Sequence, residues 1–312
     1  MERPGGEAVR RRWGARLVAT AAAVAVVFPA PLARAGAAVA APPGVGAKGA
    51  FLLDATADRA LWGKEADVRR QMASTAKIMT AVVVLDGHGA ALDRRISIKQ
   101  SYRDYVVRTG ASTADLRTGD ELTARQLLYG LMLPSGCDAA YALADAFGEG
   151  RTEAARTASF VDAMNKKAAE LGLRNTRFDS FDGLSSSSRN YSTPRDLARL
   201  SRHAMAGHTF TAVMSAMSTH QKAANVSRTY TWYNTNKLLG SYSGVIGIKT
   251  GSTSAAGPCL VFAARREKKT VIGVVLNDPT SRYPDAARML DYAFGKHTPL
   301  KLRQLPPAAH ED

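Results

Sequence analysis

Cysteine is scarce in this chain of 312 residues, which has only Cys137 and Cys259. Two cysteines permit at most one disulfide bond, and this excludes the multiply bridged framework of small exported proteins. No cluster of cysteine and histidine has the spacing of a metal site. We therefore expect no metal and no cofactor, and we favour two free thiols over a Cys137–Cys259 bond.

Acidic residues are also in short supply, with 27 Asp and Glu against 42 Lys and Arg, so the formal net charge is +15. The chain has no zinc-knuckle or helix-turn-helix signature, and we expect no nucleic-acid partner. No long amphipathic stretch follows Pro299, so we expect a short tail over residues 296–312 without a membrane anchor. The excess of positive charge favours contact with anionic wall polymers or a membrane surface, with solubility alone as the alternative.

The longest apolar run, Leu17 to Phe28, is too short for an ordinary membrane span. It follows four arginines between positions 10 and 16 and precedes Ala33-Arg34-Ala35, a small-x-small cleavage pattern. We predict a secretory signal peptide over residues 1–35 and an exported, extracytoplasmic protein, with an uncleaved anchor as the alternative. Residues 36–47 form a flexible lead-in. Without the +4 of residues 1–35, the chain keeps +11 of its net +15.

Hydrophobic patterning divides the rest of the chain into strands, then helices, then strands. Apolar runs at 50–54 and 60–63 predict a hairpin. A helix is expected at about 74–87, and a helical insert at about 90–210 includes a polar, serine-rich loop. Three β-type runs with short connections follow, and then a last helix; these elements are expected at 244–250, 259–265, 270–276 and about 284–294.

This order of elements predicts an α/β (α+β) fold over residues 48–295. Its antiparallel sheet takes strands from both chain ends, is flanked by helices and carries a helical subdomain. A cleft between the sheet and the helical part is the natural place for a functional site.

The sequence Ser74-Thr75-Ala76-Lys77 stands at the start of an apolar helical run. Positions i and i+3 share a helix face, so the serine hydroxyl lies beside the lysine amine. A hydroxyl becomes a useful nucleophile when a nearby base takes its proton. A lysine can be that base when burial or a second cation holds it neutral. Taken alone, the pattern is more often a serine N-cap.

Two further motifs follow in the chain. Ser135-Gly136-Cys137 precedes a helix, and Lys249-Thr250-Gly251 lies on a late strand that could equally be an ordinary edge strand. Ser-x-x-Lys, then Ser-Gly-x, then Lys-Thr-Gly is the motif order of penicilloyl serine transferases. Ser188-Arg189-Asn190 also spells Ser-x-Asn, but it lies too late in the chain, and we reject it.

With these motifs, the chain resembles the low-molecular-mass penicillin-binding proteins of the D-alanyl-D-alanine carboxypeptidase family, peptidase family S11. The likeness covers about residues 48–295 and is greatest to exported actinobacterial DD-transpeptidase/carboxypeptidase members. It rests on STAKIMTA, YGLMLPSGCDAAYALAD, FDSFDGL, YSTPRDL and GVIGIKTGS. The resemblance implies the penicilloyl serine transferase (β-lactamase/transpeptidase-like) fold. It also implies a serine-type peptidase that acts on peptidoglycan stem peptides ending in D-Ala-D-Ala, in cell-wall synthesis or remodelling, and that β-lactams inhibit.

The resemblance also implies roles for the motif residues. Ser74 would be the nucleophile, Lys77 its base and Ser135 the donor to the leaving D-Ala. The remaining residues would contact the substrate: Lys249 and Thr250 at its terminal carboxylate, Gly251 by leaving room for its backbone, and Ser252 with Ser74 through backbone N–H groups.

Cys137 departs from the asparagine usual in the wider family, and a thiol is a weaker donor. We therefore expect the hydrogen bonding of position 137 to the substrate to be weaker than in the wider family. The subgroup resembled also has cysteine here, so the change does not by itself imply inactivity. No Glu-x-x-x-Asn element occurs in the loop 178–192, so fast β-lactam hydrolysis is not expected; Asp179 and Asp182 there are expected to cap turns. A predominant DD-transpeptidase and a catalytically weak wall-binding relative remain the alternatives.

Overall fold

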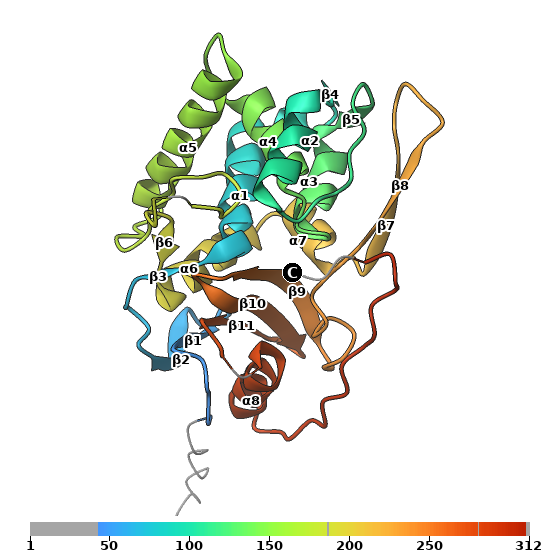
Figure 1. Cartoon of the computed structure of the whole chain (residues 1–312). Coiled ribbons are helices and arrows are strands. Elements are labelled where there is room, and N and C mark those ends of the chain that lie inside the picture. The colour runs from blue at the N-terminus through green and yellow to red at the C-terminus, as the bar shows by residue number, and fades with distance from the viewer. Residues whose placement is uncertain (1–42, 186, 280, 310–312) are drawn as a thin grey trace, which may run out of the picture. The chain divides into compact units, whose positions relative to one another are not determined.

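A five-stranded antiparallel sheet lies at the base of the fold (Figure 1). Its order is β2-β1-β11-β10-β9, with β1 (Gly49–Asp54), β2 (Arg59–Lys64), β9 (Val245–Thr253), β10 (Gly257–Arg266) and β11 (Lys269–Leu276). The predicted hairpin and the three late strands are therefore confirmed. This computed structural model describes residues 43–185, 187–279 and 281–309. The predicted signal peptide and most of the lead-in lie outside these residues.

The sheet joins the two ends of the chain. Strand β1 pairs with β11 from Gly49 opposite Leu276 to Asp54 opposite Val271. Successive residues of β1 face opposite sides, so Phe51 contributes to one core and Leu52 to the other. Because both faces of the strand are covered, the whole of β1 is buried.

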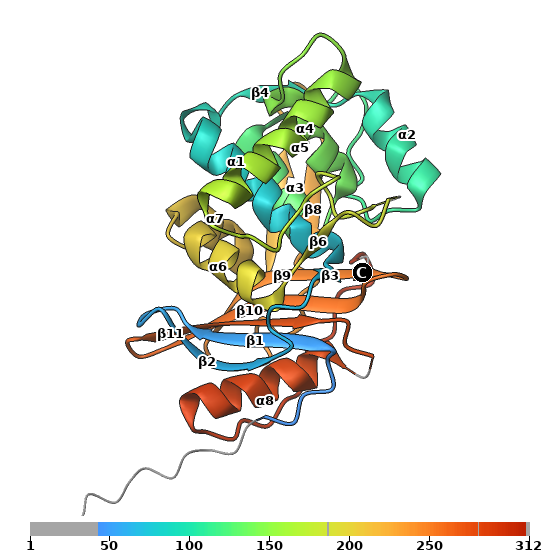
Figure 2. The same ribbon diagram turned by 90° about the vertical axis from the view of Figure 1, so that its left-hand side faces the viewer.

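Helices cover both faces of the sheet, as the turned view shows (Figure 2). Helix α8 (Arg282–Phe294) packs on β1, β10 and β11 from one side. Helix α6 (Pro194–Ala204) packs on β1 and β11 from the other. The two buried cores on either side of the sheet account for the apolar character of its central strands.

The remaining helices form a layer above α6 and β9 (Figures 1 and 2). Helix α1 runs through this layer and packs against α3, α4, α5 and α7. The helices are α1 (Lys77–His88), α2 (Gln100–Thr109), α3 (Ala124–Met132), α4 (Cys137–Phe147), α5 (Glu153–Glu170) and α7 (His208–Ser215).

Several helix starts were predictable because their caps are local. Thr123 Oγ1 accepts from Gln126 N at 3.2 Å, while the Gln126 side chain accepts from Thr123 N at 2.8 Å, which completes a capping box. Pro194 stands in the first turn of α6, whose cap is Thr193.

Other elements were not located individually from the sequence, although α2 lies within the predicted helical insert. Helix α2 is a mostly polar segment at the surface. Three small two-stranded pairs also form, and they are held by partners distant in sequence or by a long hairpin. Their strands are β3 (Arg70–Gln71) with β6 (Tyr191–Ser192), β4 (Arg95–Ser97) with β5 (Glu121–Thr123), and β7 (Ser218–Lys222) with β8 (Thr229–Tyr233). The short turns are η1 (Ala73–Ala76) and η2 (Gly89–Ala91).

The described part of the C-terminal tail lies against this domain. Leu300 and Leu302 pack on the core beneath the sheet. Arg303 N donates to Ser241 Oγ at 2.8 Å, and its guanidinium donates to Asn236 O at 3.3 Å. Within the ranges that the structure describes, no helix is both long enough and apolar enough to span a bilayer.

Candidate active site

Ser74 lies in η1, directly before α1, where the sheet meets the helical layer. It does not cap α1, because Ala76 is the N-cap residue and no side chain caps that end. The N-cap interpretation of Ser74 is therefore wrong. Instead Ser74 Oγ lies 2.9 Å from Lys77 Nζ, as the i, i+3 spacing predicts. Ala73, just before it, has φ +47°, a strained conformation that sets the direction of the turn.

Lys77 is fully buried and has three neighbours at its amine. Its Nζ donates to Asp182 O at 2.9 Å and to Cys137 Sγ at 3.3 Å, in addition to the Ser74 contact. A neutral amine has two N–H donors and one lone pair. The carbonyl and the sulfur match the two donors, so the lone pair can face the Ser74 hydroxyl.

The second wall is the turn Ser135-Gly136-Cys137 before α4. Ser135 is fully buried with φ +64°, and its Oγ has no hydrogen-bond partner within the described residues. Ser112 holds this turn at two points, because its Oγ donates to Ser135 O at 2.7 Å and its carbonyl accepts from Cys137 N at 2.8 Å. The turn thus presents a hydroxyl whose hydrogen-bonding capacity is unused.

Both cysteines are buried and free, as expected. Burial raises the pKa of Cys137 to about 12, although the neighbouring Lys77 amine opposes this shift. The thiol therefore stays protonated at neutral pH, so Cys137 is not an activated nucleophile. It can offer only the weak hydrogen bonding of a thiol.

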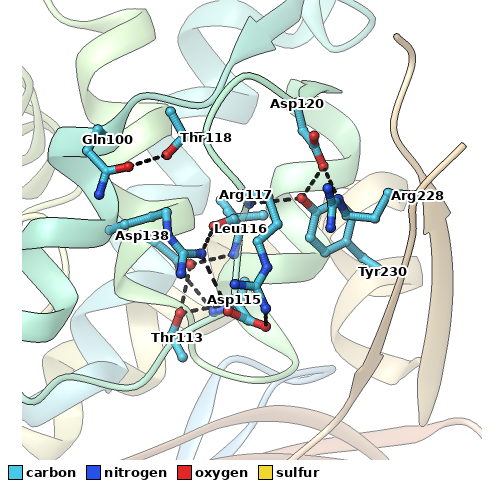
Figure 3. A network of polar contacts seen from close by, with 12 residues as sticks. Gln100, Thr113, Asp115, Leu116, Arg117, Thr118, Asp120, Asp138, Arg228 and Tyr230 are labelled. Carbon is cyan, nitrogen blue, oxygen red and sulfur yellow. Dashed lines mark hydrogen bonds and ion pairs between the residues drawn. The ribbon is translucent and has the colours of Figure 1, made fainter. Parts of the chain in front are cut away.

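A buried carboxylate anchors the loop 111–117 beside this turn (Figure 3). Asp138 accepts from Thr113 Oγ1 and Ala114 N, both at 2.8 Å, and from Leu116 N at 3.0 Å. On the far side, Arg117 N donates to Tyr230 OH at 3.0 Å, which ties the loop to β8. The loop is thereby fixed at both ends.

The third wall is the end of β9. Lys249 and Thr250 are each 1% exposed, so the alternative of an ordinary solvent-facing edge strand is wrong, although β9 is an edge strand of the sheet. Lys249 Nζ donates to Thr250 O at 3.0 Å. The Thr250 hydroxyl lies 2.8 Å from the hydroxyl of Thr235, which fixes its orientation.

Gly251 lies where β9 passes η1. A Cβ at this position would be 2.8 Å from Ser74 N and 3.0 Å from Thr75 N. The glycine therefore admits the backbone of η1, a structural reason distinct from the predicted approach of a ligand. The close approach also brings the backbone directly before Ser252 next to the nucleophile.

A surface cleft of about 550 Å³ opens between these walls. Ser74, Cys137 and Ser252 line it, together with residues 109–113, 184, 253 and 254. Lys77, Ser135, Lys249 and Thr250 are buried beneath its floor. The structure thus brings all eight predicted site residues to one region, where three of them line the cleft.

Four groups that contact the predicted site residues or fix their position were not identified from the sequence. They are Ser112, Thr235, the Asp182 carbonyl and Arg282, whose Nη1 donates to Gly251 O at 3.0 Å and to Cys259 O at 3.2 Å. None has a local sequence signal, because each acts on a motif far away in the chain. The turn-capping prediction for Asp182 is confirmed by its Oδ1 accepting from Leu184 N at 2.9 Å.

The turn-capping prediction for Asp179 is wrong, because within the described residues no backbone N–H donates to its carboxylate. Asp179 instead accepts from Ser185 Oγ at 2.6 Å, a side-chain contact across the loop. The rejected Ser188–Asn190 motif lies outside the cleft, and Asn190 Nδ2 donates to Ser180 Oγ at 2.9 Å within the same loop.

The fold and the site together define a class of active-serine enzyme with a lysine three residues after the serine, set between an antiparallel sheet and a helical layer. The sequence model of the D-alanyl-D-alanine carboxypeptidase family, peptidase family S11, matches residues 36–280. The chain belongs to this family, which confirms the resemblance drawn from the motifs.

Individual relatives agree with this assignment. The chain is 49% identical over 258 residues to a D-alanyl-D-alanine carboxypeptidase of Streptomyces sp. strain K15, covering 81% of this chain and 88% of that one. It is 32% identical to D-alanyl-D-alanine carboxypeptidase DacF of Bacillus subtilis, over 80% of this chain and 63% of that longer protein. The crystal structure of the Streptomyces K15 DD-transpeptidase matches with a TM-score of 0.79 and 49% identity, over 82% of this chain and all of that one. The chain therefore has the penicilloyl serine transferase fold.

Proposed function

We propose that this protein is a serine-type D-Ala-D-Ala carboxypeptidase that acts on peptidoglycan stem peptides and binds penicillin. Family membership and the named activity of the 49% identical relative support the reaction class. The observation that carries the proposal for this chain is the 2.9 Å contact between Ser74 Oγ and the buried Lys77 Nζ. A nucleophile paired with a buried base is what acyl transfer through a serine requires.

In the proposed acylation step, Ser74 Oγ attacks the carbonyl of the penultimate D-Ala and Lys77 accepts its proton. The base must be neutral for this step. Lys77 is fully buried, and no carboxylate forms an ion pair with it among the described residues. Its contacts with Asp182 O and Cys137 Sγ fix the direction of the lone pair.

The collapse of the tetrahedral intermediate needs a proton for the leaving D-Ala. The buried Ser135 hydroxyl, which has no hydrogen-bond partner within the described residues, supports a role as the relay that gives a proton to the leaving amine and recovers one from the protonated Lys77. The oxyanion would be held by the backbone N–H groups of Ser74 and Ser252, each contributing roughly 3–4 kcal/mol to the transition state. The close passage of Gly251 against Ser74 N is consistent with this arrangement.

We assign the terminal carboxylate of the substrate to Lys249 and Thr250. Lys249 supplies a buried positive charge, and Thr250 supplies a hydroxyl that Thr235 orients. A charge-assisted contact of this kind favours peptides with a free C-terminus. Cys137, at the cleft surface, would contact the substrate with its weak thiol donor.

The acyl-enzyme can pass to water or to an amine. Hydrolysis gives carboxypeptidase activity, and aminolysis gives the transpeptidation after which the K15 DD-transpeptidase is named. We propose hydrolysis as the main route, with transpeptidation as the second candidate. β-Lactams would acylate Ser74 as substrate mimics and be released slowly.

We further propose that the protein is exported and works in the cell wall or at the outer face of the membrane. The sequence pattern of residues 1–35 and the peptidoglycan substrate both support this location. The positive charge of the chain supports a peripheral association with an anionic surface or polymer.

A fluorescent penicillin tests the nucleophile. Wild-type protein should be labelled with a stoichiometry of one, Ser74→Ala should not, and Ser215→Ala, an exposed serine on α7, should match the wild type. Equal labelling of wild type and Ser74→Ala would overturn the assignment, and no labelling of any protein would favour a wall-binding relative. Product analysis on a D-Ala-D-Ala stem peptide, with and without an added amine, then separates hydrolysis from transpeptidation.

A further inference from the structure

A second and larger cleft, of about 740 Å³, lies at the opposite end of the sheet from the catalytic residues. Arg265 marks it on β10, whereas Cys259 on the same strand pairs with Gly251 at the catalytic end. Arg265 is six positions further along β10 than Cys259, which places this cleft about 20 Å away along the strand. Helix α6 forms its other wall and packs on β1 and β11 (Figure 2). We name it the α6 cleft.

The lining of the α6 cleft is strongly basic. Arg199, Arg202 and His203 come from α6, and Arg265 faces them from the sheet. Asp58 is the one acidic residue of the lining. It pairs with Arg202 at 3.0 Å, and Arg202 also donates to a backbone carbonyl at 3.2 Å. Arg202 is therefore held in place by the protein itself.

The other two arginines keep unused donors. Within the described part of the chain, Arg199 makes no hydrogen bond and no ion pair shorter than 4.0 Å. Arg265 uses Nε alone, in a 3.2 Å bond to Thr270 Oγ1, and leaves both Nη groups without a partner. Two exposed guanidinium groups from separate elements thus line one concavity. Asp67, with which Arg199 interacts electrostatically, lies outside the lining and pairs with Arg195.

Guanidinium groups match phosphate oxygens in a bidentate geometry, better than ammonium groups do. The volume of the cleft exceeds what one phosphate needs, and an adjoining smaller cleft shares Thr56 with it. The smaller cleft adds Arg266, Lys268 and Lys269, against Asp54 and Glu267. The two adjoining clefts together form a surface with a net positive charge. Such a surface suits a ligand with repeated phosphate groups.

A membrane surface fits this region less well than a polymer chain. The large apolar side chains that are exposed among the described residues, Val68, Val107, Met217 and Val226, do not line the α6 cleft. A bilayer would need such side chains, or a flat basic surface, to gain binding energy. A concave basic site receives a narrow chain instead.

We propose that the α6 cleft binds a phosphodiester-linked polyanion. Arg199 and Arg265 grip successive phosphates, and the catalytic cleft at the other end of the sheet remains open. This site would hold the enzyme on an anionic polymer while stem peptides reach Ser74. The proposal goes beyond the peptidase function and does not depend on it, because it rests on a separate cleft.

Binding of fluorescent poly(glycerol phosphate) tests the proposal. Each lost charge-assisted contact is worth about tenfold in affinity or more, so Arg199→Ala/Arg265→Ala should weaken binding at least about 100-fold. The matched control Arg125→Ala/Arg151→Ala removes the same charge from exposed positions outside the cleft and should change binding less than about twofold. Arg199→Lys/Arg265→Lys keeps both positive charges but lacks the planar guanidinium groups. Its loss of binding affinity should be intermediate between those of the other two double variants. Penicillin labelling in solution, equal in all variants, shows that each is folded.

Several outcomes would overturn the proposal. Equal weakening by the cleft and control variants would mean that attraction is spread over the whole basic surface. Equal binding of poly-glutamate by the wild type would mean that the site does not select phosphate. Binding that depends on Arg199 and Arg265 for phosphatidylglycerol vesicles, but is absent for the polymer, would assign the cleft to a membrane surface instead.

Discussion

Replacement of Asp138 by asparagine tests whether the fixed loop 111–117 maintains the catalytic turn. The side chain is 1% exposed and accepts three bonds from the loop. An amide keeps one acceptor and puts an NH2 donor in place of the other. The Thr113 hydroxyl can rotate to accept from that donor, but Leu116 N–H then faces a second donor. One buried N–H loses its partner and the remaining bonds lose charge assistance, so we expect a destabilisation of about 2–4 kcal/mol.

The expected loss of activity has the same origin. Ser112 lies at the start of this loop and donates to Ser135 O at 2.7 Å, so a loosened loop releases the turn that carries the Ser135 hydroxyl. Misplacement of a catalytic group by about 1 Å can cost on the order of 100-fold in rate. We therefore expect acylation by a fluorescent penicillin to slow by about tenfold to 100-fold.

Asp115→Asn is the matched control, because it makes the same change in the same loop. Asp115 is 56% exposed and pairs with Arg117 at 2.6 Å, so its loss should cost less than about 1 kcal/mol. Urea unfolding gives the stability of both variants, and stopped-flow labelling gives their acylation rates. If Asp138→Asn matches the control in both measurements, the loop does not organise the site in the way argued.

The other predictions concern the site itself. Gly251→Ala would place a Cβ 2.8 Å from Ser74 N and should abolish penicillin labelling, whereas Gly87→Ala, with nothing within 4 Å, should raise stability by up to about 1 kcal/mol in thermal unfolding. Arg282→Gln removes the guanidinium that donates to Gly251 O and Cys259 O, so it should loosen the end of β9 and slow penicillin labelling. The pKa of Cys137 is raised from 9.0 to about 12, so the folded state binds more protons across this range. Its contribution to stability should fall as pH rises above about 9, and Cys137→Ala should lose less stability than wild type between pH 8 and 11. An identical pH dependence in the two proteins would contradict the buried, protonated thiol.

The sequence predicted what depends on local signals. Apolar runs located the sheet strands, and caps such as Thr123 located the helices. The i, i+3 spacing predicted the contact between Ser74 and Lys77. The cap interpretation of Ser74 failed because the chain forms a separate short turn before α1, held by β9 and by the loop around Asp182. No local pattern encodes that turn.

Contacts that join distant segments were beyond prediction for the same reason. The partner of Lys77 at the Asp182 carbonyl is a backbone atom, and any residue type supplies a carbonyl. Thr235 and Arg282 reach β9 from outside its motif, and their type alone does not indicate this. The basic α6 cleft combines side chains of α6 with one from β10. The net charge of the chain therefore indicated that a positively charged surface exists, but not where in the fold it lies.

The pairing of β1 with β11 has a consequence for how the protein reaches its native state. Residues 49–54 are made early, but they find their partner only at residues 271–276. Because closing so long a loop costs entropy before any contact repays it, the sheet should form late and slowly. Lys249 lies on the same sheet, so a nascent chain that ends before β11 contains every catalytic motif and still lacks the completed sheet that holds them together. Penicillin labelling during synthesis would therefore act as a timer for the final step of folding.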